Sequence, residues 1–470
     1  MNIEQHDEKR FLIKASNLTN KKLFVEFYQP KYQFLLDKLN KSPYPLYSLK
    51  KLSKRMFDGP FGSNRKVDMY QESGIPYIRV KDVLPSGISF DELTYISEEK
   101  HNELIRSRVV TGTLLITIAG RVGTAAVFPE TLKEGNITGH IVGIELIEEI
   151  NPYYVAAFIN SQFGEFQVTR LGHRTTRLEL NLSEVGEILI PLPPRKIQDK
   201  IAQVSQDAYI KKNKITFTAK QILEKIDFYV LESLGISLND IYHEKHFIAP
   251  ISKFLGRRFD VGAISKEFQI SDYSHISWIN LHEVAELPTS TKIASRNPDK
   301  EYIYIGMPDV DEHLGEVNLQ TLLGKDIKAN KIIIKGDDIV FARIEPCIYN
   351  LKIALIPSNI EEALGSTELL IARPKPNILP SFLLWILRSK LIQSQILGKM
   401  TGTTGRRRLP NNIFASLKLP KICLDLQKLV ASEATQQRDK AKLMYIEAEN
   451  LVIQTKAHVE RMILGEEDVA

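Results

Sequence analysis

The longest regular pattern in the chain is a seven-residue repeat of apolar positions within residues 195–232. Mostly polar and charged side chains lie between these positions, and the spacing predicts one helix of roughly 55 Å at about 1.5 Å per residue. An ordinary amphipathic helix gives a similar pattern over a few turns, so the spacing alone does not establish a coiled coil. We expect Gly235 to end the helix. The repeated positions are Ile201, Ala208, Ile215, Ile222 and Tyr229.

A second segment of similar length, residues 425–464, has alanine at seven-residue intervals. The alanines are Ala434, Ala441 and Ala448. Small side chains in such a row allow two helices to approach closely, so we expect the two long helices to pack antiparallel.

The pattern between residues 75 and 191 is mainly one of short strands. Ile75–Val80, Leu114–Ile118 and Ile141–Ile147 are apolar runs with turn-forming residues nearby. Residues 47–56 and 152–162 instead predict short helices. The chain is therefore predicted to be α+β, with mixed α/β domains joined by two long, antiparallel, coiled-coil-like helices.

The same pattern occurs twice, because segments of the first half recur in the same order about 224 to 232 residues later. Each repeat ends with a loop rich in threonine and arginine, a short apolar strand that ends in proline, and a helix that begins near a glutamine. Any single match could arise by chance, but the conserved order indicates an internal duplication. These segments are Gly172–Arg177, Ile188–Pro191 and Gln198 in the first repeat, and Gly402–Arg408, Leu417–Pro420 and Gln427 in the second.

The overall composition narrows the class of protein. The chain has 470 residues, a formal net charge of +5 and 43% hydrophobic residues, a length that favours two or three domains over one core. The mild basic excess permits a nucleic-acid partner without requiring one. Cys347 and Cys423 are the only cysteines, which excludes a disulfide framework and fits a reducing cytosol. No apolar run reaches the length of a membrane span and the first residues lack a signal-peptide core, so we expect a cytoplasmic protein without membrane association.

Signs of catalysis are weak in this sequence. Asn151-Pro152-Tyr153-Tyr154 resembles the Asn-Pro-Pro-Tyr loop of adenine-N6 methyltransferases, but the second proline is absent and no glycine-rich cofactor loop accompanies it. A helix N-cap followed by proline explains the same residues. The ten histidines show no metal-ligand spacing. We therefore expect no catalytic residue, no metal site and no cofactor bound by this chain.

The two basic loops carry the remaining chemical signal. Arginine and threonine side chains bind phosphates and read guanine edges, although a basic run is more often a solvated surface. Glycines surround both loops and both lie at equivalent points of the repeat, which favours binding to one extended polyanion. For Arg406–Arg408 we prefer phosphate contacts, because adjacent loop residues rarely all reach one groove floor. The candidate DNA-binding residues are Gly62, Ser63, Arg79, Lys81, Arg121, His173, Arg174, Thr176, Arg177, Arg343, Thr403, Thr404, Arg406, Arg407 and Arg408.

Several motifs together resemble one known family, the specificity subunits of Type I restriction–modification systems. They are Gly59–Ser63, Gly74–Arg79, Gly112–Gly123, and Leu182–Pro191 with Gln198. The resemblance covers nearly the whole chain apart from the first forty-odd residues. The second half departs from the family pattern, because Arg343–Pro346 replaces a glycine-rich turn, and Ile197 and Leu426 stand where the family usually has glutamate.

The resemblance implies two target recognition domains, each of which reads one half of a bipartite site in double-stranded DNA. It also implies that two methyltransferase subunits dock on the long helices with S-adenosylmethionine, that restriction subunits add ATP- and Mg-dependent translocation and cleavage, and that this chain is non-catalytic. The alternatives are a specificity subunit of a related Type II-like or other defence-associated adenine methyltransferase system, or a coiled-coil scaffold that does not bind DNA. The predicted segments are an N-terminal extension at 1–45, target recognition domains at 46–194 and 246–422, a central helix at 195–236 and a C-terminal helix at 423–465.

Overall fold

The computed structural model describes residues 25–60, 70–174, 178–237, 273, 275–290, 297–327, 331–402 and 407–467. The chain divides into two compact units, the first of residues Met1–Lys214 with Glu447–Ala470 and the second of Ile215–Ile446. The boundary between the units falls inside both long helices, α6 (Arg195–Glu232) and α13 (Leu424–Leu464). Both helices confirm the sequence prediction. Gly235 follows α6 with φ +73° and donates its N–H to the carbonyl of Glu232, as expected of a helix-ending glycine.

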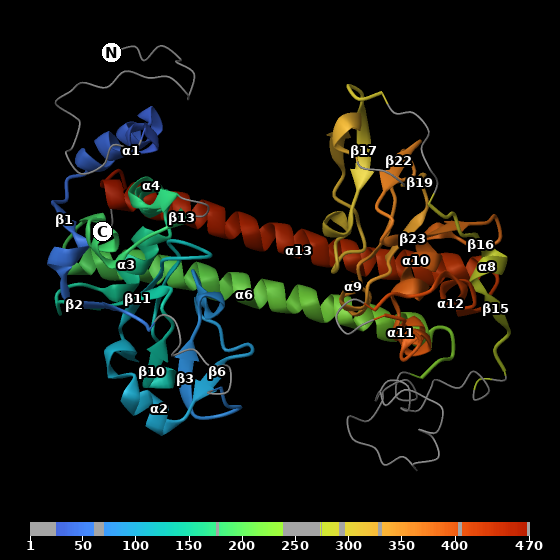
Figure 1. Cartoon of the computed structure of the whole chain (residues 1–470), viewed down its shortest axis with the longest axis horizontal. Coiled ribbons are helices and arrows are strands. Elements are labelled where there is room, and N and C mark those ends of the chain that lie inside the picture. The colour runs from blue at the N-terminus through green and yellow to red at the C-terminus, as the bar shows by residue number, and fades with distance from the viewer. Residues whose placement is uncertain are drawn as a thin grey trace. The chain divides into compact units, whose positions relative to one another are not determined.

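The first unit is built on two four-stranded sheets (Figure 1). Strands β3 and β10 run parallel, with Tyr77 opposite Asn136, and the neighbouring pairs are antiparallel. One sheet has the order β6 (Thr94–Ile96), β3 (Ile75–Ile78), β10 (Glu134–Ile137), β7 (Arg108–Val110), and the other has the order β2 (Ser53–Asp58), β11 (Ile141–Leu146), β8 (Leu114–Thr117), β9 (Ala125–Val127). Short two-stranded ladders join β4 (Val83–Leu84) to β5 (Gly87–Ile88) and β12 (His173–Arg174) to β13 (Leu178–Glu179).

Helices from both ends of the chain complete the first unit. Leu39, Ile201 and Ile463 are fully buried in one core, which brings an early helix and the two long helices together. The Ser42 hydroxyl donates to the Ile463 carbonyl at 2.9 Å, and the Glu460 carboxylate accepts from the Gln162 N–H at 2.8 Å. The start of α6 therefore packs with the end of α13. The other helices of this unit are α1 (Pro30–Asn40), α2 (Glu98–Glu103), α3 (Pro152–Ile159), α4 (Gln162–Leu171) and α5 (Leu182–Gly186).

The second unit repeats the topology of the first strand for strand. Its parallel pair is β17 with β22, in which Tyr304 lies opposite Leu364. This identity of order and direction confirms the internal duplication. One sheet has the order β18 (Gln320–Leu323), β17 (Glu301–Ile305), β22 (Ala363–Gly365), β19 (Ile332–Ile334), and the other has the order β16 (Ala285–Glu286), β23 (Leu369–Pro374), β20 (Ile339–Ala342), β21 (Ile353–Leu355).

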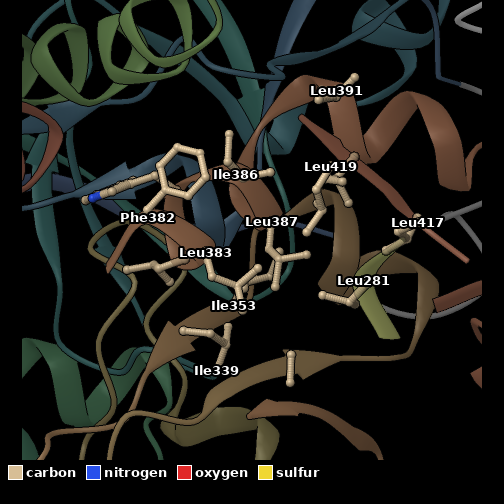
Figure 2. Packing of buried hydrophobic residues seen from close by; sticks show 14 of the residues in the cluster. Leu281, Ile339, Ile353, Phe382, Leu383, Ile386, Leu387, Leu391, Leu417 and Leu419 are labelled. Atoms are coloured by element: carbon tan, nitrogen blue, oxygen red, sulfur yellow. The ribbon is translucent and has the colours of Figure 1, made fainter. Parts of the chain in front are cut away.

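The core of the second unit lies between α10 and the sheet that contains β20 and β21. Leu383 and Leu387 of α10 point towards Ile339 and Ile353 (Figure 2), and all four side chains are buried. Val430 of α13 and Leu231 of α6 belong to the same core, so here the start of α13 packs with the end of α6 and the two helices are antiparallel, as predicted. The helices of this unit are α8 (Leu281–Val284), α9 (Glu345–Tyr349), α10 (Pro380–Arg388), α11 (Lys390–Ile396) and α12 (Asn411–Ala415), with parts of α6 and α13.

A ladder between its first and last strands closes each unit. These ladders pair β1 (Leu46–Ser48) with β14 (Leu189–Pro191), and β15 (Trp278–Asn280) with β24 (Lys418–Pro420). The glutamine near each long-helix start then ties that helix to the unit. Gln198 accepts the Asn151 N–H at 2.9 Å and donates to the Pro193 carbonyl at 2.9 Å. Gln427 accepts the Leu379 N–H at 2.9 Å and donates to the Ile422 carbonyl at 3.1 Å.

At one equivalent point the two units use different polar side chains. Asn160, which follows α3, donates to the Ala125 carbonyl at 2.8 Å and accepts the Ala125 N–H at 3.0 Å. Arg388, the last residue of α10, is buried and donates to four carbonyl groups. The acceptors are Leu351 at 2.8 Å, Ile353 at 2.7 Å, Glu312 at 2.9 Å and His313 at 3.0 Å. Burial lowers the pKa of Arg388 to about 10, which still leaves it charged at neutral pH.

Two predicted helices differ in the structure. The helix predicted over 47–56 is wrong: a 3-10 turn at Leu49–Leu52 separates β1 from β2, because these residues pair with β14 and β11. The helix predicted over 152–162 ends at Ile159, and α4 begins at Gln162 after a break at Ser161.

Candidate nucleic-acid interface

The described residues on either side of the first basic loop pair as two short strands. In the first unit β12 and β13 pair with His173 opposite Glu179, and the Leu180 N–H donates to the Ile118 carbonyl at 3.0 Å, just after β8. Gly172 precedes the hairpin, and a Cβ there would lie 2.6 Å from Leu178 Cδ1 and 3.0 Å from the Glu179 carbonyl oxygen, so a larger residue would require its neighbours to shift. The hairpin is therefore fixed to the end of a central strand.

The second unit has the same hairpin at the equivalent place. Thr401 and Arg408 exchange two backbone hydrogen bonds of 3.0 and 2.8 Å, and the Leu409 N–H donates to the Arg343 carbonyl at 2.9 Å, just after β20. This anchor matches the one from Leu180 to Ile118, so Arg408 occupies the position that Glu179 has in the first unit. The Thr/Arg loops thus share a location, but their arginines are not equivalent residue by residue.

Acidic side chains form ion pairs with Arg407 and Arg408, which follow the second basic loop. Nε and Nη2 of Arg408 donate to the two carboxylate oxygens of Glu368 at 2.9 and 2.7 Å. Arg407 binds Glu345 in the same forked manner, with Nε 2.6 Å from Oε2. The hydrogen bond from Arg408 lowers the pKa of Glu368, so this carboxyl stays ionised at neutral pH.

Arg343 lies beside this cluster. Its Nη2 donates to the Leu409 carbonyl at 3.3 Å, and its charge also lowers the pKa of Glu368, after the larger effect of Arg408. Its Nε is buried and has no hydrogen-bond partner within the described part of the chain. The structure thus brings together three of the predicted residues of the second unit, Arg343, Arg407 and Arg408.

Three predicted residues of the first unit also meet. Nη2 of Arg121 donates to the Lys81 carbonyl at 2.8 Å, and Nζ of Lys81 lies 2.6 Å from a carboxylate oxygen of Glu92. Arg79 forms a fork with Asp82, with Nε 3.1 Å and Nη2 3.2 Å from the two carboxylate oxygens. Lys81 and Arg121 are exposed, whereas Asp82 is buried. This cluster thus contains two exposed cations, Lys81 and Arg121, and one arginine, Arg79, whose guanidinium is oriented by a carboxylate.

The other predicted residues cannot be placed in these clusters. Gly62, Ser63, Thr176, Arg177, Thr403, Thr404 and Arg406 lie outside the described residues, and of His173 and Arg174 only the backbone is described. Their roles stay predictions.

The sequence analysis missed the acidic partners of these arginines. Asp82 had a detectable signal, because Asp309 stands at the equivalent position of the second repeat and accepts the Gly306 N–H at 2.7 Å, as Asp82 accepts the Arg79 N–H at 2.9 Å. Glu345 and Glu368 had no such signal, since their contacts depend on residues far apart in the sequence.

The described residues give little support for a metal or membrane site. No group of three His, Cys, Asp or Glu side chains in the described ranges is placed to hold a metal ion. None of the helices found in those ranges has the length and apolar character needed to cross a bilayer.

A cavity of about 420 Å³ in the second unit contains a carboxyl group with an unusual pKa. Burial raises the pKa of Asp227 to about 6, although the Lys390 N–H donates to it at 3.1 Å. In the unfolded chain the pKa of an aspartate is about 3.9. The folded state therefore binds the proton more tightly, and ionisation of Asp227 costs stability as pH rises from about 4 to about 6.

Replacement of Asp227 by asparagine should remove this cost. We expect Asp227→Asn to match the wild type near pH 4 and to exceed it by about 2 kcal/mol above pH 6. Urea unfolding followed by tryptophan fluorescence measures this, because both tryptophans of the chain, Trp278 and Trp385, lie in the second unit. The control is Glu460→Gln. In the first unit the Glu460 carboxylate accepts the N–H at the start of α4, as Asp227 accepts the N–H at the start of α11 in the second unit. A stability difference that is constant over this pH range would contradict the assignment.

Comparisons with known proteins agree with the motifs. Residues 62–229 match the family model described as the Type I restriction modification DNA specificity domain. The specificity subunit of the Type I restriction enzyme EcoAI of Escherichia coli is 26% identical over 206 residues, 42% of this chain and 34% of that subunit. The EcoEI specificity subunit of Escherichia coli is 28% identical over 147 residues, 30% of this chain and 24% of that subunit.

The matched segments thus span about a third or less of the length of these relatives. Among solved structures, the S subunit of a Type I restriction–modification system from M. genitalium aligns over 92% of this chain and 98% of that one, with 13% identity and a TM-score of 0.44. The motifs of the first unit and the family match concern the same stretch of sequence. Residues 62–229 are therefore similar in sequence to a Type I restriction modification DNA specificity domain.

Proposed function

We propose that the chain is the DNA-recognition subunit of a Type I restriction–modification complex, and that each unit reads one half of a bipartite site. The observation that carries this proposal is the duplication. Residues 62–229, most of which lie in the first unit, match a specificity-domain model, and the second unit repeats the strand order, parallel pair and hairpin anchor of the first. Two copies of one reading domain in a single chain suit a site with two separate halves.

The charged clusters support a division of labour within each unit. Exposed cations such as Lys81 and Arg121 suit phosphates, which position a protein on DNA, whereas forked arginines such as Arg79 have a fixed orientation that suits base edges. Which bases each unit recognises also depends on the residues of the two Thr/Arg loops.

We also propose that the chain is non-catalytic and that its partners carry the chemistry. Two methyltransferase subunits would bind S-adenosylmethionine and methylate adenine, and restriction subunits would use ATP and Mg. The support is a surface on the long helices. Within the second unit Phe217 and Phe228 lie eleven residues apart on α6, which places them near one face of that helix, and Leu443 and Ile446 of α13 are also exposed. Contiguous exposed apolar patches mark protein interaction sites, and we propose that these side chains belong to one.

The expected effect of the basic residues on DNA binding tests this function. In the assembled complex, Arg174→Ala with Arg177→Ala should weaken recognition of one half-site, and Arg407→Ala with Arg408→Ala should weaken recognition of the other. Each lost phosphate contact should make the slope of log affinity against log salt concentration shallower by about one. Titration of cognate and scrambled duplexes at several salt concentrations measures both effects.

The same experiment needs two controls. Genome-wide mapping of methylated adenine, with and without this chain, supplies the cognate duplex and tests whether the target is bipartite. Methyl transfer by the isolated chain, without its partners, would refute the non-catalytic assignment. Wild-type affinity and salt slope in both double variants would remove the hairpins from the DNA interface.

A further inference from the structure

The position of Arg408 in the second unit is fixed more strongly than expected for a loop arginine. Its N–H and carbonyl both pair with Thr401, and its backbone also forms a bridge with Ile344. Its side chain then forks onto Glu368, which stands directly before β23 and whose carbonyl accepts the Arg343 N–H at 3.0 Å. Both the backbone and the guanidinium plane of Arg408 are therefore held by the sheet.

The fork leaves one particular edge of the guanidinium available. A guanidinium has five N–H donors, and Nε and Nη2 of Arg408 each use one of theirs on Glu368. Nη1 has no hydrogen-bond partner among the described residues, and Nη2 retains a second N–H. The side chain of Arg408 is 46% exposed, so part of it is open to solvent. These two nitrogens have the spacing that pairs with O6 and N7 of guanine.

The charge of the pair disfavours a phosphate partner. Both oxygens of the Glu368 carboxylate lie within 3 Å of Arg408 nitrogens, so a phosphate on this guanidinium would be repelled by a nearby negative charge. A neutral base edge meets no such repulsion. This reverses our expectation from the sequence that the Arg406–Arg408 run contacts phosphates, as far as Arg408 is concerned.

The duplication provides a separate argument. The equivalent position in the first unit is Glu179, an exposed residue of opposite charge. A position that reads a base is expected to differ between two units that read different sequences.

We propose that Arg408 is a base-reading residue that pairs with O6 and N7 of one guanine in the half-site of the second unit, and that Glu368 is its positioning residue. The proposal rests on the DNA-recognition function above and specifies which base one residue reads.

Selection from a randomised duplex library by the assembled complex, followed by sequencing, tests the assignment. Arg408→Lys keeps the charge but loses the planar fork. We expect this variant to lose about ten- to hundredfold of the preference for guanine at one position of the selected site. The preferences at the other positions and the slope of log affinity against log salt concentration should stay unchanged. Glu368→Gln is expected to relax the same pair and to increase affinity for unrelated DNA, because one negative charge is removed.

A matched control is Arg461→Lys in the first unit. Arg461 is 46% exposed, like Arg408, and its Nε donates to Glu467 at 2.6 Å, but it lies on α13. It should leave the selected sequence unchanged, and tryptophan fluorescence verifies that the Arg408 and Glu368 variants are folded. Uniform loss of affinity for all sequences would assign Arg408 to phosphate and overturn the proposal, as would an unchanged consensus in both variants. A wild-type complex that selects no sequence would instead overturn the DNA-recognition function itself.

Discussion

Replacement of Arg388 by alanine is expected to destabilise the second unit by about 4 kcal/mol or more. The side chain is buried and donates to the carbonyls of Leu351, Ile353, Glu312 and His313. A buried acceptor that loses its only donor costs about 1–3 kcal/mol, although the Leu351 carbonyl keeps the Ile353 N–H, and the vacated volume adds a packing cost. Urea unfolding followed by the fluorescence of Trp278 and Trp385 reports this unit alone.

Two variants control for this prediction. Arg388→Lys keeps a cation but offers one nitrogen in place of a planar fork, so it should recover only part of the loss. Asn160→Ala removes the two hydrogen bonds to Ala125 at the equivalent point of the first unit. It should cost about 1–3 kcal/mol in the first unit and leave the tryptophan transition unchanged. A tryptophan transition of Arg388→Ala within about 1 kcal/mol of the wild type would show that the four carbonyls find other donors.

Replacement of Phe217 by glutamate is expected to weaken binding of a methyltransferase partner by about a hundredfold or more, without loss of stability. Phe217 is 61% exposed on α6, so the folded chain loses little packing when the ring is removed. In an interface a buried aromatic side chain contributes about 2 kcal/mol or more, and a carboxylate placed there would also be desolvated without a partner. Co-purification with the tagged methyltransferase subunit, followed by titration, measures the effect.

The control for Phe217 is Asn412→Asp. Asn412 is exposed on α12, another helix of the same unit, and acquires the same charge without loss of an apolar side chain. This variant should bind the partner as the wild type does. Equal partner affinity in Phe217→Glu and the wild type would exclude this face of α6 from the interface.

Long periodic segments were predictable because many residues contribute to one signal. The periodic segments 195–232 and 425–464 match the two long helices to within one residue at each end, although the helical segment given as 195–236 extends four residues past α6. The duplication was evident from the order of matched motifs. The helix predicted over 47–56 failed for the opposite reason. Leu49 and Leu52 have helical spacing, but the ladders of β1 with β14 and β2 with β11 outweigh this local preference.

The candidate interface was predictable only in part. Arginine-rich loops are visible as composition, and the described residues that flank the two loops pair at equivalent places of the repeat. The acidic partners of those arginines are not visible in this way. Glu368 and Arg408 are forty residues apart in the sequence. They meet because the residue before β23 and the last residue of the second hairpin both lie beside the end of β20. The distinction between a solvated cation and an oriented donor therefore required the fold.

The last helix has a consequence for the order in which the protein acquires its structure during synthesis. The first unit needs Glu460 and Ile463 for its core and its hydrogen bonds, whereas the second unit ends at Ile446. About 250 residues separate Lys214 from Ile463, which a ribosome adds in roughly 12 to 50 s. Over that interval the first-made unit presents an apolar face without its final helix. The unit made first is thus completed last, because the end of α13 is the last part of its core to be synthesised.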